Sequence, residues 1–155
     1  MGERIKPDRT ITLDRKWFAR IWNGEKTIEY RERKPCWNNA FAAWEPKNTG
    51  RFVEFKIGMM PNGPRLLVQV NQVNIGPITD EDRSKTETVY DKSQKKDVVR
   101  SQYCGWDDNY WRLHFQVVGY YMKDCGTYMP LLDPPRMKEF PHDKKQVVAS
   151  VDTRA

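Results

Sequence analysis

Alternating apolar side chains along residues 65–75 restrict the fold of this chain more than any other pattern. They occupy first one parity and then the other: Leu66, Val68, Val70, Val73 and Ile75. A period of two places apolar side chains on one face of a strand. The switch of parity indicates a β-bulge near Gln72, and bulges bend strands at the corners of barrels. The pattern therefore predicts a bent strand in a mainly β protein.

Shorter apolar runs predict further strands over residues 10–13, 27–31, 51–57 and 111–122. Between the first two of these, apolar residues recur at helical spacing: Trp17, Phe18, Ile21 and Trp22. We expect a helix over Asp14–Asn23 with that face buried, capped by the Asp14 carboxylate and ended by Gly24 in a left-handed conformation. Residues 32–50 are expected to be irregular. Strands, one clear helix and turn signals predict an α+β, mainly β fold, a small barrel with flanking helices.

The domain prediction follows from length and charge. A chain of 155 residues suits one domain of ordinary size, which we place at residues 1–129. Within it, residues 80–100 are dense in charge and are expected to form an exposed insertion, with some helix. Residues 130–155 are rich in proline and charge, and we expect a tail that is extended on the surface or partly disordered.

The composition favours an anionic partner and a reducing compartment. The net charge of +6 and the pI near 9.2 favour nucleic acid, with a merely soluble surface as the alternative. Three cysteines without CxxC spacing argue against a disulfide framework and favour the cytoplasm. His114 and His142 lack metal-ligand spacing, so we expect no metal and no cofactor. We expect no membrane partner and no signal peptide, because no long apolar run is present.

The segment from Gly24 to Arg31 carries the strongest functional signal. If residues 27–31 form a strand, Thr27, Glu29 and Arg31 project from one face, and Lys26 leans over them from the preceding turn. An ammonium, a hydroxyl, a carboxylate and a guanidinium then converge on one patch. Cations bind phosphate or carbonyl oxygens, and a carboxylate accepts from a base amino group. The alternative is an ordinary ion-paired surface strand.

Basic and aromatic residues next to this segment extend the candidate nucleic-acid site. Arg31, Arg33 and Lys34 form a basic cluster that could hold a phosphate backbone. Trp37, in an expected loop, is the best candidate for stacking on a base. Three further tryptophans are weaker candidates, for which core packing is the alternative: Trp44, Trp106 and Trp111.

The segment also resembles a known family. Gly24-x-Lys26-x-x-Glu29-x-Arg31, preceded by a helix with Trp17, Phe18 and Ile21, is similar to the signature of the ASCH (activating signal cointegrator homology) domain. The run Lys34-Pro35-Cys36-Trp37 resembles a run in small stand-alone members. The resemblance is good over residues 10–75, fair to about residue 122 and absent in the tail.

This resemblance implies a PUA-like β-barrel with flanking helices and a cleft at its mouth. The family is widely inferred to bind RNA. Some small bacterial members are amidohydrolases that remove acetyl from N4-acetylcytidine, and others are described as ribonucleases. The amidohydrolase lysine matches Lys26, but its threonine falls on Glu29, and Thr27 lies nearby at a different offset. A hydroxyl nucleophile needs an adjacent base to activate it, and a carboxylate in the position of the hydroxyl breaks that arrangement.

These observations leave three functional hypotheses. The first is a module that binds RNA, a nucleoside or a nucleotide through Lys26, Glu29 and Arg31, with Arg33, Lys34 and Trp37 beside them. The second is a hydrolase acting on a modified nucleoside or on RNA in the same cleft, with Lys26, Glu29 and Thr27 as the catalytic candidates. The third is a docking subunit of a larger ribonucleoprotein assembly.

Overall fold

The computed structural model describes residues 4–138, which fall into two compact units. Residues 4–75 and 111–138 form the first unit, and residues 76–110 form the second. The single domain expected over residues 1–129 stays a prediction. The part of the expected tail that follows residue 138, with His142, lies outside the described residues.

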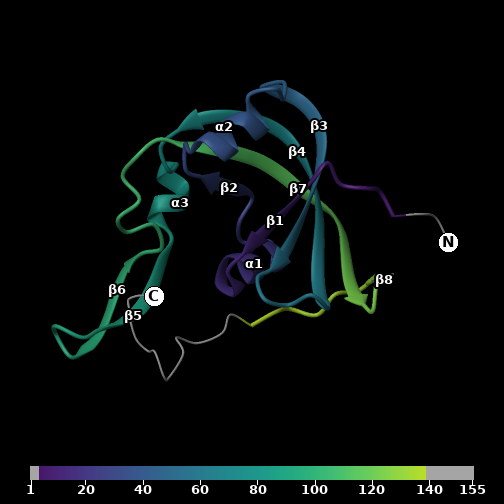
Figure 1. Ribbon diagram of the computed structural model, residues 1–155. Helices are drawn as coiled ribbons and strands as arrows, with labels where there is room; N and C mark the ends of the chain where they lie inside the picture. The colour runs from purple at the N-terminus through teal and green to yellow at the C-terminus, as the bar shows by residue number, and fades with distance from the viewer. Residues whose placement is uncertain (1–3, 139–155) are drawn as a thin grey trace. The chain divides into compact units, whose positions relative to one another are not determined.

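A mixed sheet of six strands builds the first unit (Figure 1). The strands are β1 (Arg9–Leu13), β2 (Ile28–Arg31), β3 (Lys47–Ile57), β4 (Gly63–Gly76), β7 (Tyr110–Asp124) and β8 (Thr127–Pro130). Their order is β1-β3-β4-β7-β2, with β8 paired to β7. β1 runs parallel to β3, whereas β3 and β4, β7 and β2, and β7 and β8 pair antiparallel. The prediction of a mainly β protein is confirmed.

The sheet does not close into a barrel within residues 4–138. β1 and β2 end the path of paired strands, so no backbone ladder joins them. Instead, Nη2 of Arg31, the last residue of β2, donates a hydrogen bond of 3.2 Å to the carbonyl oxygen of Thr12 in β1. A side chain therefore links the two edges where a closed barrel would have main-chain hydrogen bonds.

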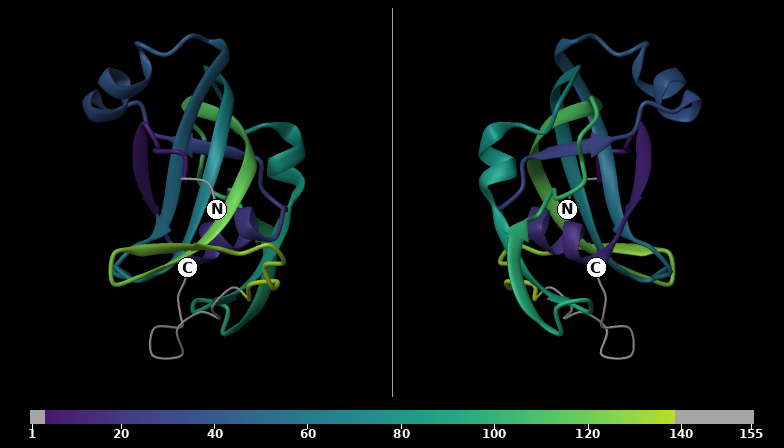
Figure 2. Two further views of the ribbon diagram at one scale, coloured as in Figure 1. Left: turned by 90° about the vertical axis from the view of Figure 1, so that its right-hand side faces the viewer. Right: turned by 90° about the vertical axis from the view of Figure 1, so that its left-hand side faces the viewer.

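The hydrophobic core of the first unit gathers residues from the helices and the long strands. Phe18, Ile21, Phe55, Val68 and Leu113 are fully buried in it. Figure 2 shows β3, β4 and β7 side by side, with the short helix α2 (Pro35–Phe41) at one end of these strands and the β7–β8 turn at the other. Phe18 and Ile21 precede β2 in the sequence and Phe41 of α2 follows it, so their burial in the core fixes the chain on both sides of β2.

Helix α1 (Arg15–Trp22) forms where the sequence predicts it, with two corrections. Asp14 occupies the N-cap position, but its carboxylate makes no capping hydrogen bond, and only its carbonyl accepts from the amide of Phe18, at 3.0 Å. Ile21 is buried as expected, whereas Trp17 is only partly buried. Gly24 adopts the expected left-handed conformation, with φ of +81°.

The irregular segment expected over residues 32–50 contains helix α2 and the start of β3. Pro35 stands in the first turn of α2, where its missing N–H costs nothing. The predicted bulge near Gln72 corresponds to a register shift at that point, but the extra residues belong to β3, between Lys47 and Arg51. Gly50 lies there at φ +64°, a conformation that a residue without Cβ adopts easily.

The second unit contains a short helix and a two-stranded hairpin. Its elements are α3 (Asp80–Ser84), β5 (Thr86–Asp91) and β6 (Lys96–Ser101). Apolar side chains of this unit are buried: Ile78, Val89, Tyr103 and Tyr110. The expected helix in the charged segment 80–100 is present, and the hairpin is an addition that the charge pattern concealed. No helix within residues 4–138 is long and apolar enough to cross a membrane.

Candidate functional site

A tight turn after α1 positions Lys26 at the start of β2. The backbone amides of Glu25 and Lys26 both donate to the carbonyl oxygen of Arg20, at 2.8 and 3.2 Å. Gly24 makes the turn possible because its positive φ is costly for residues with a Cβ. The turn delivers the Lys26 side chain toward Glu29 within a few residues of the helix end.

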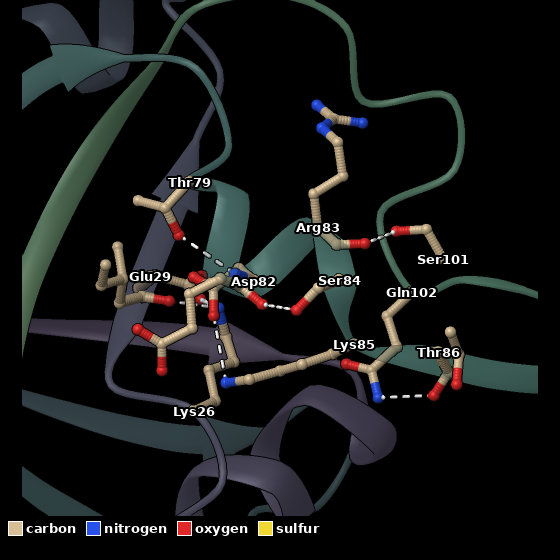
Figure 3. A network of polar contacts seen from close by, with 12 residues as sticks. Lys26, Glu29, Thr79, Asp82, Arg83, Ser84, Lys85, Thr86, Ser101 and Gln102 are labelled. Carbon is tan, nitrogen blue, oxygen red and sulfur yellow. Dashed lines mark hydrogen bonds and ion pairs between the residues drawn. The ribbon is translucent and has the colours of Figure 1, made fainter.

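Lys26, Glu29 and Arg31 form an ionic network (Figure 3 shows the first two). The Lys26 ammonium lies 3.3 Å from one Glu29 oxygen, and Nη2 of Arg31 lies 2.7 Å from the other. Lys26 also donates to the carbonyl oxygen of Ile28. Side-chain exposure is 6% for Lys26, 6% for Glu29 and 20% for Arg31. The predicted proximity of the three charged groups is confirmed, and their role in binding stays a prediction.

Thr27 is placed differently from the prediction. The strand begins at Ile28, so Thr27 lies before β2, and its residue is exposed while Lys26 and Glu29 are buried. Its carbonyl oxygen accepts a hydrogen bond from the amide of Phe115 at 3.1 Å, which extends the pairing with β7 by one bond. The expected face shared by Thr27, Glu29 and Arg31 therefore reduces to the two charged residues.

Trp37 lies on helix α2 and not in a loop. Its indole is stacked on Phe41, with ring centroids 5.4 Å apart and planes 7° from parallel, so one face of the indole is occupied. The Arg31 guanidinium carbon lies 5.0 Å from the Trp37 ring centroid. Trp37 is thereby brought next to Arg31 of the ionic network, and its stacking on a base stays a prediction.

Sequence reasoning missed Arg9, the first residue of β1. Its guanidinium carbon lies 5.2 Å from the same Trp37 ring centroid. Arg9 has the same parity as Ile11 and Leu13, which are buried in the core. An arginine on the apolar parity of a strand is the signal that could have identified it.

Arg33 and Lys34 are not part of the ionic network. Both residues are exposed, and the Lys34 ammonium pairs with Glu32 at 3.1 Å while its side chain stays 61% exposed. Lys34 also occupies the N-cap position of α2. These residues remain candidates for contact with a phosphate backbone.

The other tryptophans pack mainly against aromatic neighbours. Trp44 makes an edge contact with Phe41 and has Arg51 5.7 Å from its centroid. Trp111 donates its indole N–H to Asn38 at 2.7 Å. In the second unit, Trp106 contacts Tyr103 and Tyr110. All three thus have aromatic neighbours, which for Trp111 is again Phe41, and stacking of any of them on a base stays a prediction.

Residues 135–137 cross the end of α1 beside the Lys26 turn. The indole N–H of Trp22 donates to the carbonyl oxygen of Pro135 at 2.7 Å. The Asn23 side chain bonds both backbone groups of Met137: its amide donates to the carbonyl at 2.7 Å, and its oxygen accepts from the N–H at 2.8 Å. Arg136 pairs with Glu25. These contacts fix residues 135–137 to the end of α1 and to the turn that carries Lys26.

Figure 3 also labels polar contacts within the second unit. The hydroxyl of Thr79 accepts from the amide of Asp82 at 3.2 Å, and the Ser101 hydroxyl donates to the Arg83 carbonyl at 2.7 Å. These bonds cap α3 and attach it to the end of β6. Across residues 4–138, no group of three or more His, Cys, Asp or Glu side chains could hold a metal ion.

Comparison of the chain with protein-family models, with curated proteins and with solved structures found no match.

Proposed function

We propose that this chain is an ASCH-type module with a PUA-like fold that binds RNA or a nucleoside through Lys26, Glu29 and Arg31. The resemblance of residues 24–31 to the ASCH signature supports the assignment. The hydrogen bond between Arg31 and the Thr12 carbonyl supports a PUA-like fold whose barrel is incompletely closed, because it links the two sheet edges that no backbone ladder joins. The cytoplasm is the compartment that we propose for this activity.

The observation that carries the proposal is the ionic network itself. Lys26 and Glu29 are almost fully buried, and taking two charges out of water costs several kcal/mol, which their attraction only partly offsets. A buried ion pair is therefore weak evidence for stability, and charged groups with constrained environments cluster at functional sites. Arg31, at 20% exposure, is the member that remains accessible to a ligand.

Binding of short single-stranded RNA and of a nucleoside panel tests the proposal. We expect affinity for RNA that falls with added salt, since neutralised phosphates release counterions. Loss of a shielded charge-assisted contact costs about 1.5–3 kcal/mol, so Lys26→Ala and Arg31→Ala should each weaken binding by about 10- to 100-fold. Arg51→Ala is the control, because the Arg51 side chain is 44% exposed, already pairs with Asp8 and lies outside the candidate site. Unchanged affinity in both test variants, with circular dichroism like that of the native protein, would contradict the proposal.

The same protein and variants distinguish the hydrolase hypothesis. We expect weak or no turnover of N4-acetylcytidine, because Glu29 stands where a hydroxyl is needed and Thr27 is exposed outside the strand. Robust turnover that Lys26→Ala abolishes would replace the binding proposal by an enzyme. Loss of that turnover in Glu29→Ala would then indicate water activation, and loss in Thr27→Ala a hydroxyl nucleophile. Co-purification in a large particle would favour the docking subunit.

A further inference from the structure

Two arginines from different strands converge on one indole. Arg9 begins β1 and Arg31 ends β2, and their guanidinium carbons lie 5.2 and 5.0 Å from the Trp37 ring centroid. Phe41 stacks parallel to this indole, so the space left for both guanidiniums is the remaining face and the ring edges. We call Arg9 and Arg31 the arginine pair.

The charges of the arginine pair are only partly balanced within residues 4–138. Arg31 pairs with Glu29 through Nη2, which also bonds the Thr12 carbonyl, whereas its Nε is buried and has no hydrogen-bond partner. Arg9 has its cation–π contact with Trp37 and no carboxylate partner in this part of the chain. Glu29 also pairs with Lys26, so this carboxylate is shared between two cations, Lys26 and Arg31.

Such an arrangement is favourable when an anion neutralises it. Two guanidiniums close to each other repel, and an indole face offsets this by only about 0.5–1 kcal/mol per cation at an exposed site. Guanidinium groups present planar forks of N–H donors that match the oxygens of a phosphate. Stacking on a fixed ring orients these forks before binding, which lowers the entropy lost when a ligand is bound.

We propose that Arg9 and Arg31, supported by Trp37, bind a phosphate group of the ligand. This inference rests on the proposed function and adds to it a residue, Arg9, and a ligand class, a phosphorylated nucleotide or the phosphodiester of an RNA strand. The phosphate then lies between the start of β1 and the end of β2, where the two arginines stand.

Inorganic phosphate is the direct probe, titrated at constant ionic strength and followed by calorimetry. We expect the native protein to bind it, and Arg9→Gln and Arg31→Gln each to weaken binding by about tenfold, which is one charge-assisted contact at a partly exposed site. Arg51→Gln is the matched control: Arg51 also lies over an indole, that of Trp44, but it already pairs with Asp8 at 3.6 Å. Its affinity should stay within about twofold of the native value, since it loses only an exposed charge.

Nucleoside, nucleoside 5′-monophosphate and dinucleoside monophosphate then identify the source of the phosphate. A gain in affinity for the monophosphate alone identifies a free nucleotide, and a gain for the diester identifies an RNA backbone. In either case Arg9→Gln should abolish the gain and leave nucleoside affinity unchanged. Arg9→Lys keeps the charge without the planar fork, so it should retain the thermal stability of the native protein and part of the gain.

Equal phosphate affinity in Arg9→Gln and the native protein would overturn the inference, as would an equal loss in Arg51→Gln. The two proposals fail separately. Phosphate binding that depends on Arg9, without binding of any nucleoside or RNA, would overturn the proposed function and support the arginine pair. RNA binding that depends on Lys26 and Arg31 but not on Arg9 would support the proposed function and overturn the arginine pair.

Discussion

Replacing Glu29 by Gln removes the negative charge between Lys26 and Arg31 and keeps the size of the side chain. Both cations then lose the carboxylate that lies 3.3 and 2.7 Å from them. Lys26 keeps its hydrogen bond to the Ile28 carbonyl, and Arg31 keeps its bond to the Thr12 carbonyl. The substitution therefore isolates the electrostatic part of the network from its packing.

The size of the effect follows from burial. The Lys26 and Glu29 side chains are each 6% exposed, and removing one partner of such a buried pair costs about 3–5 kcal/mol. The Arg31 contact adds less, because Arg31 is 20% exposed and solvent screens it. The carbonyl that Lys26 retains offsets part of the cost. We expect Glu29→Gln to lower the free energy of unfolding by about 3 kcal/mol.

Urea unfolding followed by tryptophan fluorescence measures this loss. A slope of about 1–3 kcal/mol per molar urea converts it into a midpoint lower by about 1–3 M. Glu32→Gln is the matched control, because Glu32 pairs with Lys34 at 3.1 Å with both side chains more than 60% exposed. It should cost at most about 0.5 kcal/mol. Equal midpoints for the two variants would refute the account of a buried, energetically coupled network.

Three further predictions concern other parts of the chain. Asn23→Ala removes both hydrogen bonds to the Met137 backbone, so it should lower the free energy of unfolding by about 1–3 kcal/mol and speed hydrogen exchange at the Met137 amide; native protection of that amide would contradict the role given to Asn23. The hydrogen bond from the Ser93 hydroxyl, followed by that from the Gln94 amide, lowers the pKa of Asp91 below its ordinary value. The ionised Asp91 carboxylate therefore stabilises the hairpin turn fully above the unfolded-state pKa, near 3.9, and this stabilisation is lost as pH falls through the lower folded-state pKa. Backbone amide chemical shifts of the turn, measured against pH, should follow the loss. A titration midpoint of these shifts at or above about 3.9 would contradict the prediction. A thiol reagent should label the three exposed cysteines without denaturant: Cys36, Cys104 and Cys125. Fewer than three labelled sites would show that at least one thiol is buried or oxidised.

Local periodicity predicted the parts of the fold that depend on local interactions. The strands at residues 10–13 and 111–122 and the helix ending before Gly24 follow from alternation, helical spacing and a glycine stop. Helix α2 was missed because its seven residues include Pro35 and two asparagines, which are weak helix formers. Phe41, buried in the core and in contact with Trp111 of β7, supplies tertiary packing that propensity does not contain.

The candidate site divides in the same way. Lys26, Glu29 and Arg31 could be grouped from sequence because they lie within one turn and one short strand. Arg9 reaches the site only through the fold: β1 pairs with β3 in parallel, and its inward parity carries the guanidinium to Trp37. Thr27 was misplaced because its hydrogen bond with β7 uses its carbonyl and its residue lies outside the regular strand.

The contact between Asn23 and Met137 also determines which of the two positions can vary. Asn23 binds an N–H and a C=O of the main chain, and every amino acid except proline offers both. The hydrogen bonds thus impose almost no sequence requirement at position 137. Position 23 is the reverse case, because the side chain must both donate and accept: aspartate lacks the donor. Divergent forms of this protein can therefore change the segment that crosses α1 while the residue that holds it stays an amide.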